Sequence, residues 1–576
     1  MSRIPLIGVA ASFVLMAACS KQDAAPAASA EQPTTEVAAG NHAFSADINE
    51  ADFGEMVRTL SSDEFEGRGP GSKGEERTVE YIRAQMQRIG LKPGNGDSYF
   101  QDVPMVETTA DPATTLQLKI DGARQDLAFG SDMVVGTRSG QAQIKLDDSP
   151  MIFVGYGVDA PERNWNDYAG QDWTGKTVVI LVNDPGFHSN DERLFDGRKM
   201  TYYGRWTYKF EEAARKGAAA AFIIHDDAGA SYGWDVIKNS WSGAQYDLPA
   251  SDDPAPRLPM QGWLSTDAAR KLFAASGLDL DQAYAAAGKA GFKAVPLKAT
   301  ASVELNSAIS RKSSRNVVGV LPGTTRADEA VLYMAHWDHL GKHEGEGDTI
   351  YNGAVDNATG VAGILEIAGQ LAGAETKSER SQVFVAVTLE ESGLLGSQYY
   401  VAHPTFPMDK IIGVINLDAL SVAGRSRNLV VTGLGNSELE DALKPLAEAD
   451  GRVLEGEESV QSGFYFRSDH FNFAKAGVPA LYAKGGDDLI DGGKAAGKAE
   501  AEDYGRARYH QPADEFNPEW KLDGVVQDLK TFATLGASLG STATWDAPAS
   551  WPNWYEGNPF KAKRDQMLAG KSATAN

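Results

Sequence analysis

The segment AVLYMAHWDHLG at residues 330–341 decides the fold class of this chain. Residues 330–335 form an apolar run of strand length that ends directly at His336. Similar runs alternate with segments of helical periodicity over residues 314–545. Strands are predicted at 316–320, 330–335, 382–388, 411–417, 429–432 and 480–483, and helices at 358–371, 395–402, 437–449 and 524–538. This alternation predicts an α/β fold with a mostly parallel sheet sandwiched by helices.

Several predicted strands run into side chains that bind metals. The residues that follow apolar runs are His336, the adjacent Glu390 and Glu391, and Asp418. Since active sites of open α/β sheets lie beyond the carboxyl ends of the strands, we expect these side chains to lie close together. Two further candidates are Asp356, in the turn NGAVDN, and His510, in YHQP near the end of the chain.

The combination of these groups predicts a reaction. Two imidazoles and three carboxylates suit a pair of divalent ions of the zinc type, and a further carboxylate beside a ligand can act as a base. Each group alone is more often a surface pair or a helix cap. Their convergence on one sheet edge therefore favours metal-assisted hydrolysis over a purely structural interpretation.

Composition limits the classes of partner. The chain has 576 residues, a formal net charge of −25 and a single cysteine, Cys19. A strong negative charge without basic patches argues against nucleic acid as a partner. One cysteine excludes an intramolecular disulfide.

The N-terminus predicts export. Arg3 precedes an apolar run at residues 4–18, which ends in the small-residue stretch MAAC at 16–19. This pattern is typical of a signal peptide, and it resembles a bacterial lipobox, which implies cleavage before Cys19 and lipid attachment to it. Ser20 then favours sorting to the outer membrane, with the protein facing the periplasm or the cell surface. An ordinary secretory signal is the alternative.

Changes in composition and in the pattern of apolar residues along the chain predict the domain organisation. The predicted parts are a signal peptide at 1–18, a disordered tether at 19–46, an N-terminal part of the main domain at 47–141, an inserted β-rich domain at 142–298, the catalytic domain at 299–545 and a C-terminal tail at 546–576. The tether is rich in Ala, Pro, Ser and Thr and has little to bury. None of the residues in the predicted insert adds to the metal-binding set.

The motifs around the candidate ligands resemble peptidase family M28, the co-catalytic zinc aminopeptidases and their relatives. The matching stretches are AHWDHLG at 335–341, YNGAVDNATG at 351–360, TLEESGLLGS at 388–397, NLD at 416–418, SDHF at 468–471 and YHQPAD at 509–514. The stretch EFEGRGPGSKGEE from residue 64 is similar to the usual N-terminal part. More weakly, the insert resembles a protease-associated (PA) domain.

The resemblance implies a zinc-exopeptidase-like fold, two Zn²⁺ ions and a role for each residue. Asp356 would bridge both ions, with His336 and Asp418 completing one site and Glu391 and His510 the other. Glu390 would be the general base. Asp338 would hydrogen-bond the second nitrogen of His336 and hold its tautomer.

Three further residues are candidates for substrate contacts. His339 lies beside the first ligand segment, Arg467 could bind a substrate carboxylate, and Tyr482, at a strand end, could donate to the oxyanion. Asp469 and His470 are expected to support the site by contacting the ligands and not the metal ions.

We therefore expect a lipid-anchored di-zinc aminopeptidase that hydrolyses N-terminal residues from peptides. A carboxypeptidase or a glutaminyl-cyclase-like enzyme on the same scaffold is the first alternative, and a non-catalytic binding protein is the second. The intact ligand set argues against the second. The sequence leaves open the preferred N-terminal residue, zinc against cobalt or manganese, the role of the insert and the oligomeric state.

Overall fold

The computed structural model describes residues 42–253 and 255–570. The predicted signal peptide, Cys19 and most of the predicted tether lie outside these residues. Within them, no helix combines the length and the apolar character that crossing a bilayer requires.

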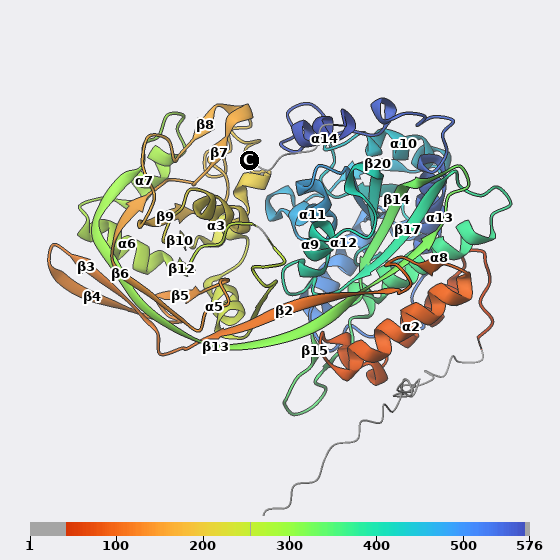
Figure 1. Cartoon of the computed structure of the whole chain (residues 1–576), viewed down its shortest axis with the longest axis horizontal. Helices are drawn as coiled ribbons and strands as arrows, with labels where there is room; N and C mark the ends of the chain where they lie inside the picture. The colour runs from red at the N-terminus through yellow and green to blue at the C-terminus, as the bar shows by residue number, and fades with distance from the viewer. Residues whose placement is uncertain (1–41, 254, 571–576) are drawn as a thin grey trace, which may run out of the picture. The chain divides into compact units, whose positions relative to one another are not determined.

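The main domain is built on a mixed sheet whose centre is parallel (Figure 1). Four parallel strands stand in the order β17 (Arg380–Val387), β14 (Arg326–His336), β18 (Ile411–Asn416) and β21 (Ala480–Gly485). The strands β13 (Val295–Leu321) and β2 (Phe100–Ala110) extend it antiparallel beyond β17, and β19 (Asn428–Val431) and β20 (Val453–Gly456) extend it beyond β21. The predicted α/β fold with a mostly parallel sheet is confirmed.

Alternate residues of β14 pack on opposite faces of this sheet, which explains its continuous apolar run. Leu332 and Met334 belong to a buried cluster with Tyr400 and Phe473 of the helices α9 (Leu395–Ala402) and α11 (His470–Lys475). Tyr333 points the other way, toward α13 (Asp523–Leu539). A strand buried on both faces cannot show the polar alternation of a half-exposed strand.

The helices on the α13 face pack closely against the sheet. They are α1 (Glu50–Leu60), α2 (Lys73–Ile89), α8 (Thr359–Gly373), α10 (Leu439–Ala449) and α13. At Gly536 of α13 a Cβ atom would lie 1.5 Å from the hydroxyl oxygen of Tyr333, so only glycine allows this approach. The predicted strands and helices of residues 314–545 all occur, and most of their ends lie within a few residues of the prediction. The exception is the strand predicted at 316–320, which is the last part of β13 and begins at Val295.

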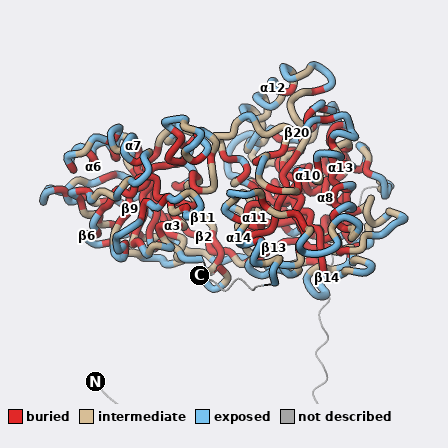
Figure 2. Tube along the Cα trace, turned by 90° about the horizontal axis from the view of Figure 1, so that it is seen from above, coloured by how far each residue is buried: buried red, intermediate tan, exposed pale blue. Residues whose placement is uncertain are grey.

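The insert has a second sheet of its own. Strands β6 (Gln143–Phe153), β9 (Thr177–Leu181), β10 (Ala220–Ile224) and β12 (Met260–Leu264) are parallel neighbours in that order. Its helices include α3 (Trp206–Arg215), α5 (Trp234–Ser242), α6 (Thr266–Ala275) and α7 (Leu280–Ala287). The predicted β-rich domain therefore contains a substantial helical part, and buried residues concentrate in its strands (Figure 2).

The strand pairing moves the start of the insert. β5 (Met133–Gly136) pairs with β12, while β3 (Thr115–Ile120) pairs with β13 and with β4 (Ala123–Ala128). These strands belong to the sheet of the insert, whereas the prediction placed residues up to 141 with the main domain. A strand pattern shows which face is buried but not which sheet it joins, and this explains the difference.

One long strand joins the two sheets. The first half of β13 pairs with β3 and β6 of the insert, and its second half pairs with β2 and β17 of the main domain (Figure 1). Further contacts hold the insert in place. Lys475 Nζ lies 3.4 Å from Glu211 Oε1, the N–H of Met200 donates to the carbonyl of Val460 over 3.0 Å, and the rings of Tyr202 and Phe471 are 5.6 Å apart.

The C-terminal segment packs into the main domain. Arg564 of α14 (Lys561–Leu568) is fully buried and donates to the carbonyls of Ile411 and Ile412. Trp554 is also buried and donates to the carbonyl of Gly477 over 3.0 Å. The remaining short elements are β1 (Lys92–Pro93), β7 (Asp159–Ala160), β8 (Trp165–Asn166), β11 (Gln245–Asp247), β15 (Gly341–Lys342), β16 (Ile350–Tyr351), α4 (Asp227–Ala230) and α12 (Gly493–Asp503).

Candidate metal centre

The structure brings all five predicted ligands together at the carboxyl edge of the parallel strands. His336 is the last residue of β14, Asp418 lies two residues beyond β18, and Glu391 lies in the turn after β17. Asp356 lies in a distorted helical turn (Ala354–Ala358) directly before α8, and His510 follows a short helical turn (Tyr504–Arg508).

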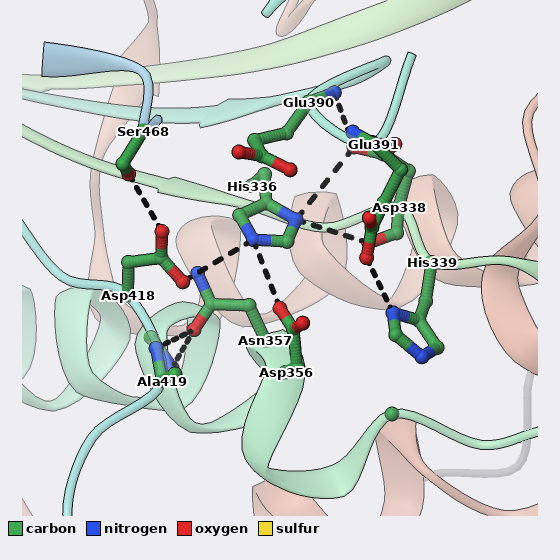
Figure 3. Close-up of polar contacts among 12 residues, drawn as sticks. His336, Asp338, His339, Asp356, Asn357, Glu390, Glu391, Asp418, Ala419 and Ser468 are labelled. Carbon is green, nitrogen blue, oxygen red and sulfur yellow. Dashed lines mark hydrogen bonds and ion pairs between the residues drawn. The ribbon is translucent and has the colours of Figure 1, made fainter. Parts of the chain in front are cut away.

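Asp356 stands between the two imidazoles. Its Oδ1 lies 3.3 Å from Nε2 of His336, and its Oδ2 lies 3.2 Å from Nε2 of His510. Figure 3 shows the ring of His336 facing both Asp356 and Asp418. A carboxylate whose two oxygens face two different imidazoles has the arrangement of a bridging ligand.

Each imidazole has a second carboxylate beside it. Asp418 Oδ1 lies 3.4 Å from Nε2 of His336, and Glu391 Oε2 lies 3.2 Å from Nε2 of His510. The buried Nε2 of His336 makes no hydrogen bond among the described residues. Groups with ligand atoms within 4.8 Å of one another are His336, Glu390 and Asp418, and His339, Asp356 and Glu391. Nitrogen and carboxylate donors at this spacing fit divalent cations of the zinc type.

Burial and charge together set the protonation of these groups. Burial raises the pKa of Glu390 well above its ordinary value, and the negative charges of Glu391 and Asp418 add to this effect. Burial and Asp356 would also raise the pKa of Glu391, but His339 and His510 outweigh them and lower it to about 2. The pKa values of the two neighbouring glutamates are therefore shifted in opposite directions. The shift of Glu390 suits a group that carries a proton, and the shift of Glu391 suits a group that stays negatively charged.

Asp338 supports the site differently from our prediction. His336 Nδ1 lies 3.1 Å from the backbone carbonyl oxygen of Asp338, whereas the nearer carboxylate oxygen is 3.8 Å away, too far for a hydrogen bond. The carboxylate instead accepts the backbone N–H groups of Glu390 at 3.1 Å and Glu391 at 3.4 Å. Asp338 thus orients the imidazole through its main chain and the glutamate pair through its side chain.

Two side chains hold Asp418. Ser468 Oγ donates to Asp418 Oδ2 over 2.6 Å, and the hydroxyl of Tyr482 donates to the backbone carbonyl of Asp418 over 3.2 Å. This second contact occupies the only proton of the Tyr482 hydroxyl, which favours a positioning role over the oxyanion role that we predicted. The side chains of Asp469 and His470, which we expected to support the site, are fully buried, and Asp469 accepts a hydrogen bond from the hydroxyl of Ser397 over 2.6 Å.

His339 lies inside the site. It is 1% exposed, and its Nδ1 lies 2.7 Å from Glu391 Oε1 (Figure 3). Its Nε2 has no hydrogen-bond partner among the described residues. The substrate-facing position that we considered does not fit this degree of burial, and contact with Glu391 is the role that the structure supports. Arg467, by contrast, is exposed and directly precedes Ser468.

Sequence reasoning missed Arg68, which organises the loops that carry the ligands. Its fully buried guanidinium donates to the carbonyls of Trp337 at 2.8 Å, Asn352 at 2.6 Å and Gly353 at 2.7 Å. It also donates to Leu60 at 3.0 Å and reaches Asp356 at 3.4 Å. The only signal in the sequence was a lone arginine among glycines in FEGRGPG, within the stretch that resembled the family.

A second missed residue is Asp514, which fixes the turn that carries Asp356. Its two carboxylate oxygens accept the backbone N–H groups of Val355 and Asp356, each over 3.0 Å. Its place four residues after His510 was visible in YHQPAD, but the sequence gave no sign of its target.

Comparison with known proteins supports the name peptidase part for the main domain. Residues 316–532 match the model of peptidase family M28. These residues contain all five candidate ligands and the Glu390–Glu391 pair.

Similar solved structures include three bacterial proteins. An aminopeptidase from Aneurinibacillus sp. strain AM-1 is 21% identical, with 85% of this chain and 94% of that chain covered and a TM-score of 0.46. The zinc aminopeptidase BSAP from Bacillus subtilis is 18% identical, with 90% of this chain and 99% of that chain covered and a TM-score of 0.39. A peptidase M28 precursor from Shewanella amazonensis SB2B is 18% identical, with 86% of this chain and 94% of that chain covered and a TM-score of 0.38. Because the identities and TM-scores are this low, these structures give no evidence about the chemistry of this chain. The similarity to a peptidase family therefore rests on the family model and on its agreement with the site. Over residues 316–532, the peptidase part of this chain is similar to peptidase family M28.

Proposed function

We propose that this protein is a metal-dependent aminopeptidase that holds two Zn²⁺ ions and removes N-terminal residues from peptides. The observation that carries the proposal is Asp356, whose two oxygens face His336 and His510 at 3.3 Å and 3.2 Å. His336 and Asp418 would complete one ion site, and Glu391 and His510 the other. The chemistry supplied by such a cation pair, when bound, is activation of a water molecule and polarisation of the scissile carbonyl.

The residues of the chain would do the remaining work. Glu390 is not needed as a ligand, and its raised pKa suits a group that accepts a proton and releases it again. Its carboxylate would take a proton from the attacking water and pass it to the leaving amine. Asp338 would hold Glu390 in reach through the backbone N–H that it accepts at 3.1 Å.

Metal analysis combined with kinetics tests this proposal. We expect about two ions per chain by elemental analysis, as the family implies, and hydrolysis of aminoacyl anilides with a free amine but not of N-blocked ones. Glu390→Gln should keep the metal and lower kcat by ~10²–10⁴, the usual cost of losing a general base. Robust turnover by this variant would refute the base assignment, and cleavage of N-blocked substrates alone would favour the carboxypeptidase alternative.

We also propose that the chain is exported and anchored by lipid at Cys19, with a PA-like insert that restricts access to the site. The support is the stretch MAAC at 16–19 after an apolar run, together with the separate sheet of the insert. Labelling of growing cells with an alkyne fatty acid tests the anchor. Wild-type protein should carry the label and fractionate with the outer membrane, whereas Cys19→Ser should do neither.

A further inference from the structure

A cavity of about 280 Å³, here called the junction cavity, lies where three parts of the chain meet. Most of its wall comes from residues 196–203 of the insert, from two loops of the peptidase part at 433–436 and 457–466, and from the C-terminal segment at 555–560. None of the five candidate ligands lines it, and neither does Glu390. Because pockets that bind small molecules measure about 300–1,000 Å³, the junction cavity suits a ligand at the small end of that range.

The segments around the junction cavity are packed against one another. The N–H of Met200 donates to the carbonyl of Val460 over 3.0 Å, and both residues line the cavity. Gly463 adopts a left-handed φ of 61° where it lies against the side chain of Met200. On the C-terminal side, the rings of Tyr202 and Phe560 are 5.5 Å apart. The insert, the loop at 457–466 and the C-terminal segment therefore form one continuous wall.

Two opposite charges in this wall have no ionic partner. Lys199 of the insert and Glu457 of the peptidase part both line the cavity and are half-buried. Among the described residues, no carboxylate oxygen lies within 4.0 Å of the Lys199 ammonium, and no cationic nitrogen lies within 4.0 Å of the Glu457 carboxylate. The remaining charged groups of the wall have partners, which are Asp196 for Arg163 at 3.2 Å and Lys561 for Glu556 at 3.4 Å.

Backbone contacts place the two unpaired charges near each other. Lys199 Nζ lies 3.5 Å from the carbonyl oxygen of Leu434, and Glu457 Oε2 accepts the N–H of Gly433 over 2.9 Å. Since Gly433 and Leu434 are consecutive, both charged groups contact the same short stretch of backbone while they remain more than 4.0 Å apart. At that separation they cannot hydrogen-bond to each other. A ligand that carries an anion and a cation close together would give each of them a charged partner.

The rest of the wall is largely aromatic. Tyr202, Tyr465, Phe466 and Phe560 all line the cavity. Tyr465 is 4% exposed, and its buried hydroxyl has no hydrogen-bond partner among the described residues. Aromatic rings favour contact with apolar groups, and a buried hydroxyl without a partner costs free energy that a polar ligand atom would recover. Apolar rings with a few polar groups are the usual composition of a small-molecule pocket.

We propose that the junction cavity binds a free α-amino acid with a large apolar side chain. Its carboxylate would pair with Lys199, its ammonium group would pair with Glu457, and its side chain would lie against the aromatic rings. An α-amino acid carries both charges on one carbon, so it fits two closely spaced partners better than a peptide, whose terminal charges are further apart. The ligand would tie the insert to the peptidase part. The inference goes beyond the proposed peptidase function and does not depend on it.

Calorimetric titration with L-phenylalanine tests the proposal on the folded protein. We expect Lys199→Gln and Glu457→Gln each to raise Kd by about tenfold to hundredfold relative to the wild type, the usual effect of losing one charge-assisted hydrogen bond. Lys199→Arg keeps the charge and should keep most of the affinity. For the wild type, 3-phenylpropionate lacks the ammonium group, phenethylamine lacks the carboxylate and L-alanine lacks the ring, so each should bind more weakly than L-phenylalanine.

Arg198→Gln and Glu458→Gln are the matched controls. Each changes the exposed neighbour in sequence of one proposed contact, and neither residue lines the cavity. Both variants should bind L-phenylalanine with the wild-type Kd. The comparison also separates the cavity from the metal centre, where an amino acid released by the proposed reaction can bind. Binding at the metal centre alone would leave Lys199→Gln and Glu457→Gln equal to the wild type, and that result would overturn the proposal.

A variant that fills the cavity gives a second check without removing a charge. Val460 is half-buried and lines the cavity, so Val460→Trp should block the ligand. Because a ligand that binds only the folded state stabilises it, L-phenylalanine should raise the Tm of the wild type but not that of Val460→Trp. An equal rise in both proteins would refute the proposal. Neither measurement needs turnover, so failure to hydrolyse aminoacyl anilides would refute the peptidase function and leave this inference intact.

Discussion

Arg68 donates to the backbone carbonyl of Trp337 over 2.8 Å, although 269 positions separate the two residues. The same guanidinium holds the carbonyls of Asn352 and Gly353. It therefore clamps the loop that follows His336, the last residue of β14, to the turn that carries Asp356. Its charge also lies near the carboxylates of Asp514, Asp356 and Asp338, which raise its pKa against the larger effect of burial.

Arg68→Lys should weaken metal binding. One ammonium group cannot span carbonyls that a planar guanidinium reaches together, so the two loops lose their common anchor. We expect the zinc affinity, measured by competition with a chelator, to fall by about tenfold to hundredfold, the usual effect of removing outer-shell support.

Arg564→Lys is the control for this substitution. Arg564 is equally buried and also donates to backbone carbonyls, those of Ile411 and Ile412, at the other end of β18. Both variants should lower the thermal unfolding temperature, but Arg564→Lys should keep the wild-type zinc affinity. Equal affinities in the two variants would show that Arg68 is merely structural.

Asp338→Asn should slow turnover and leave metal binding nearly intact. The asparagine keeps the backbone carbonyl that contacts His336 but loses one of the two side-chain acceptors for the N–H groups of Glu390 and Glu391. We expect kcat to fall by about tenfold to hundredfold because the base is misplaced. A loss of zinc affinity of the same size would instead place the carboxylate on the imidazole, as the sequence led us to expect.

Tyr482→Phe should have a small effect. Its hydroxyl donates to the carbonyl of Asp418, so its removal disturbs one ligand loop and no reacting atom. We expect kcat to fall by less than about tenfold, whereas loss of an oxyanion donor costs ~10²–10³. Tyr333→Phe is the control, because the Tyr333 hydroxyl is buried without a hydrogen-bond partner among the described residues, on the far side of the sheet.

Glu366 should make stability depend on pH near neutrality. Burial raises its pKa to about 7, and the charge of Asp52 adds to this effect. A carboxyl whose pKa is raised in the folded state stabilises the fold fully only below its unfolded pKa of 4.5. This stabilisation is lost as the pH rises through its folded pKa of about 7. The free energy of unfolding should therefore decline between these values, by up to about 3 kcal/mol from this group.

Glu366→Gln isolates this contribution. The amide keeps an oxygen for the backbone N–H of Asn49, which donates to Glu366 over 3.0 Å, but it cannot ionise. By denaturant unfolding, the variant should match the wild type near pH 4.5 and exceed its stability at pH 8. A difference between the two proteins that does not change with pH would contradict this account.

Much of the peptidase part could be predicted from its sequence. The strands that end at His336 and just before Asp418 are long apolar runs, and burial on both faces of a parallel sheet leaves such runs in any sequence. The ligand-type residues that follow them were predicted to converge because parallel strands end at one edge. Their distances in the structure agree with that expectation.

Contacts between distant segments were beyond prediction. The start of the insert depends on β3 and β5 joining its sheet, and a strand pattern does not identify the partner strand. The roles of Asp338 and Tyr482 depend on which of several nearby acceptors or donors lies within hydrogen-bond distance, a matter of a few tenths of an ångström.

The sequence by itself determined the order of strands and helices in the peptidase part and the set of groups that can bind metal, because periodicity and residue chemistry are local properties. Only the tertiary structure decided that Arg68 would join two loops and that Asp356 would stand between two imidazoles. Such relationships arise from packing between segments hundreds of residues apart, and local sequence carries no record of them.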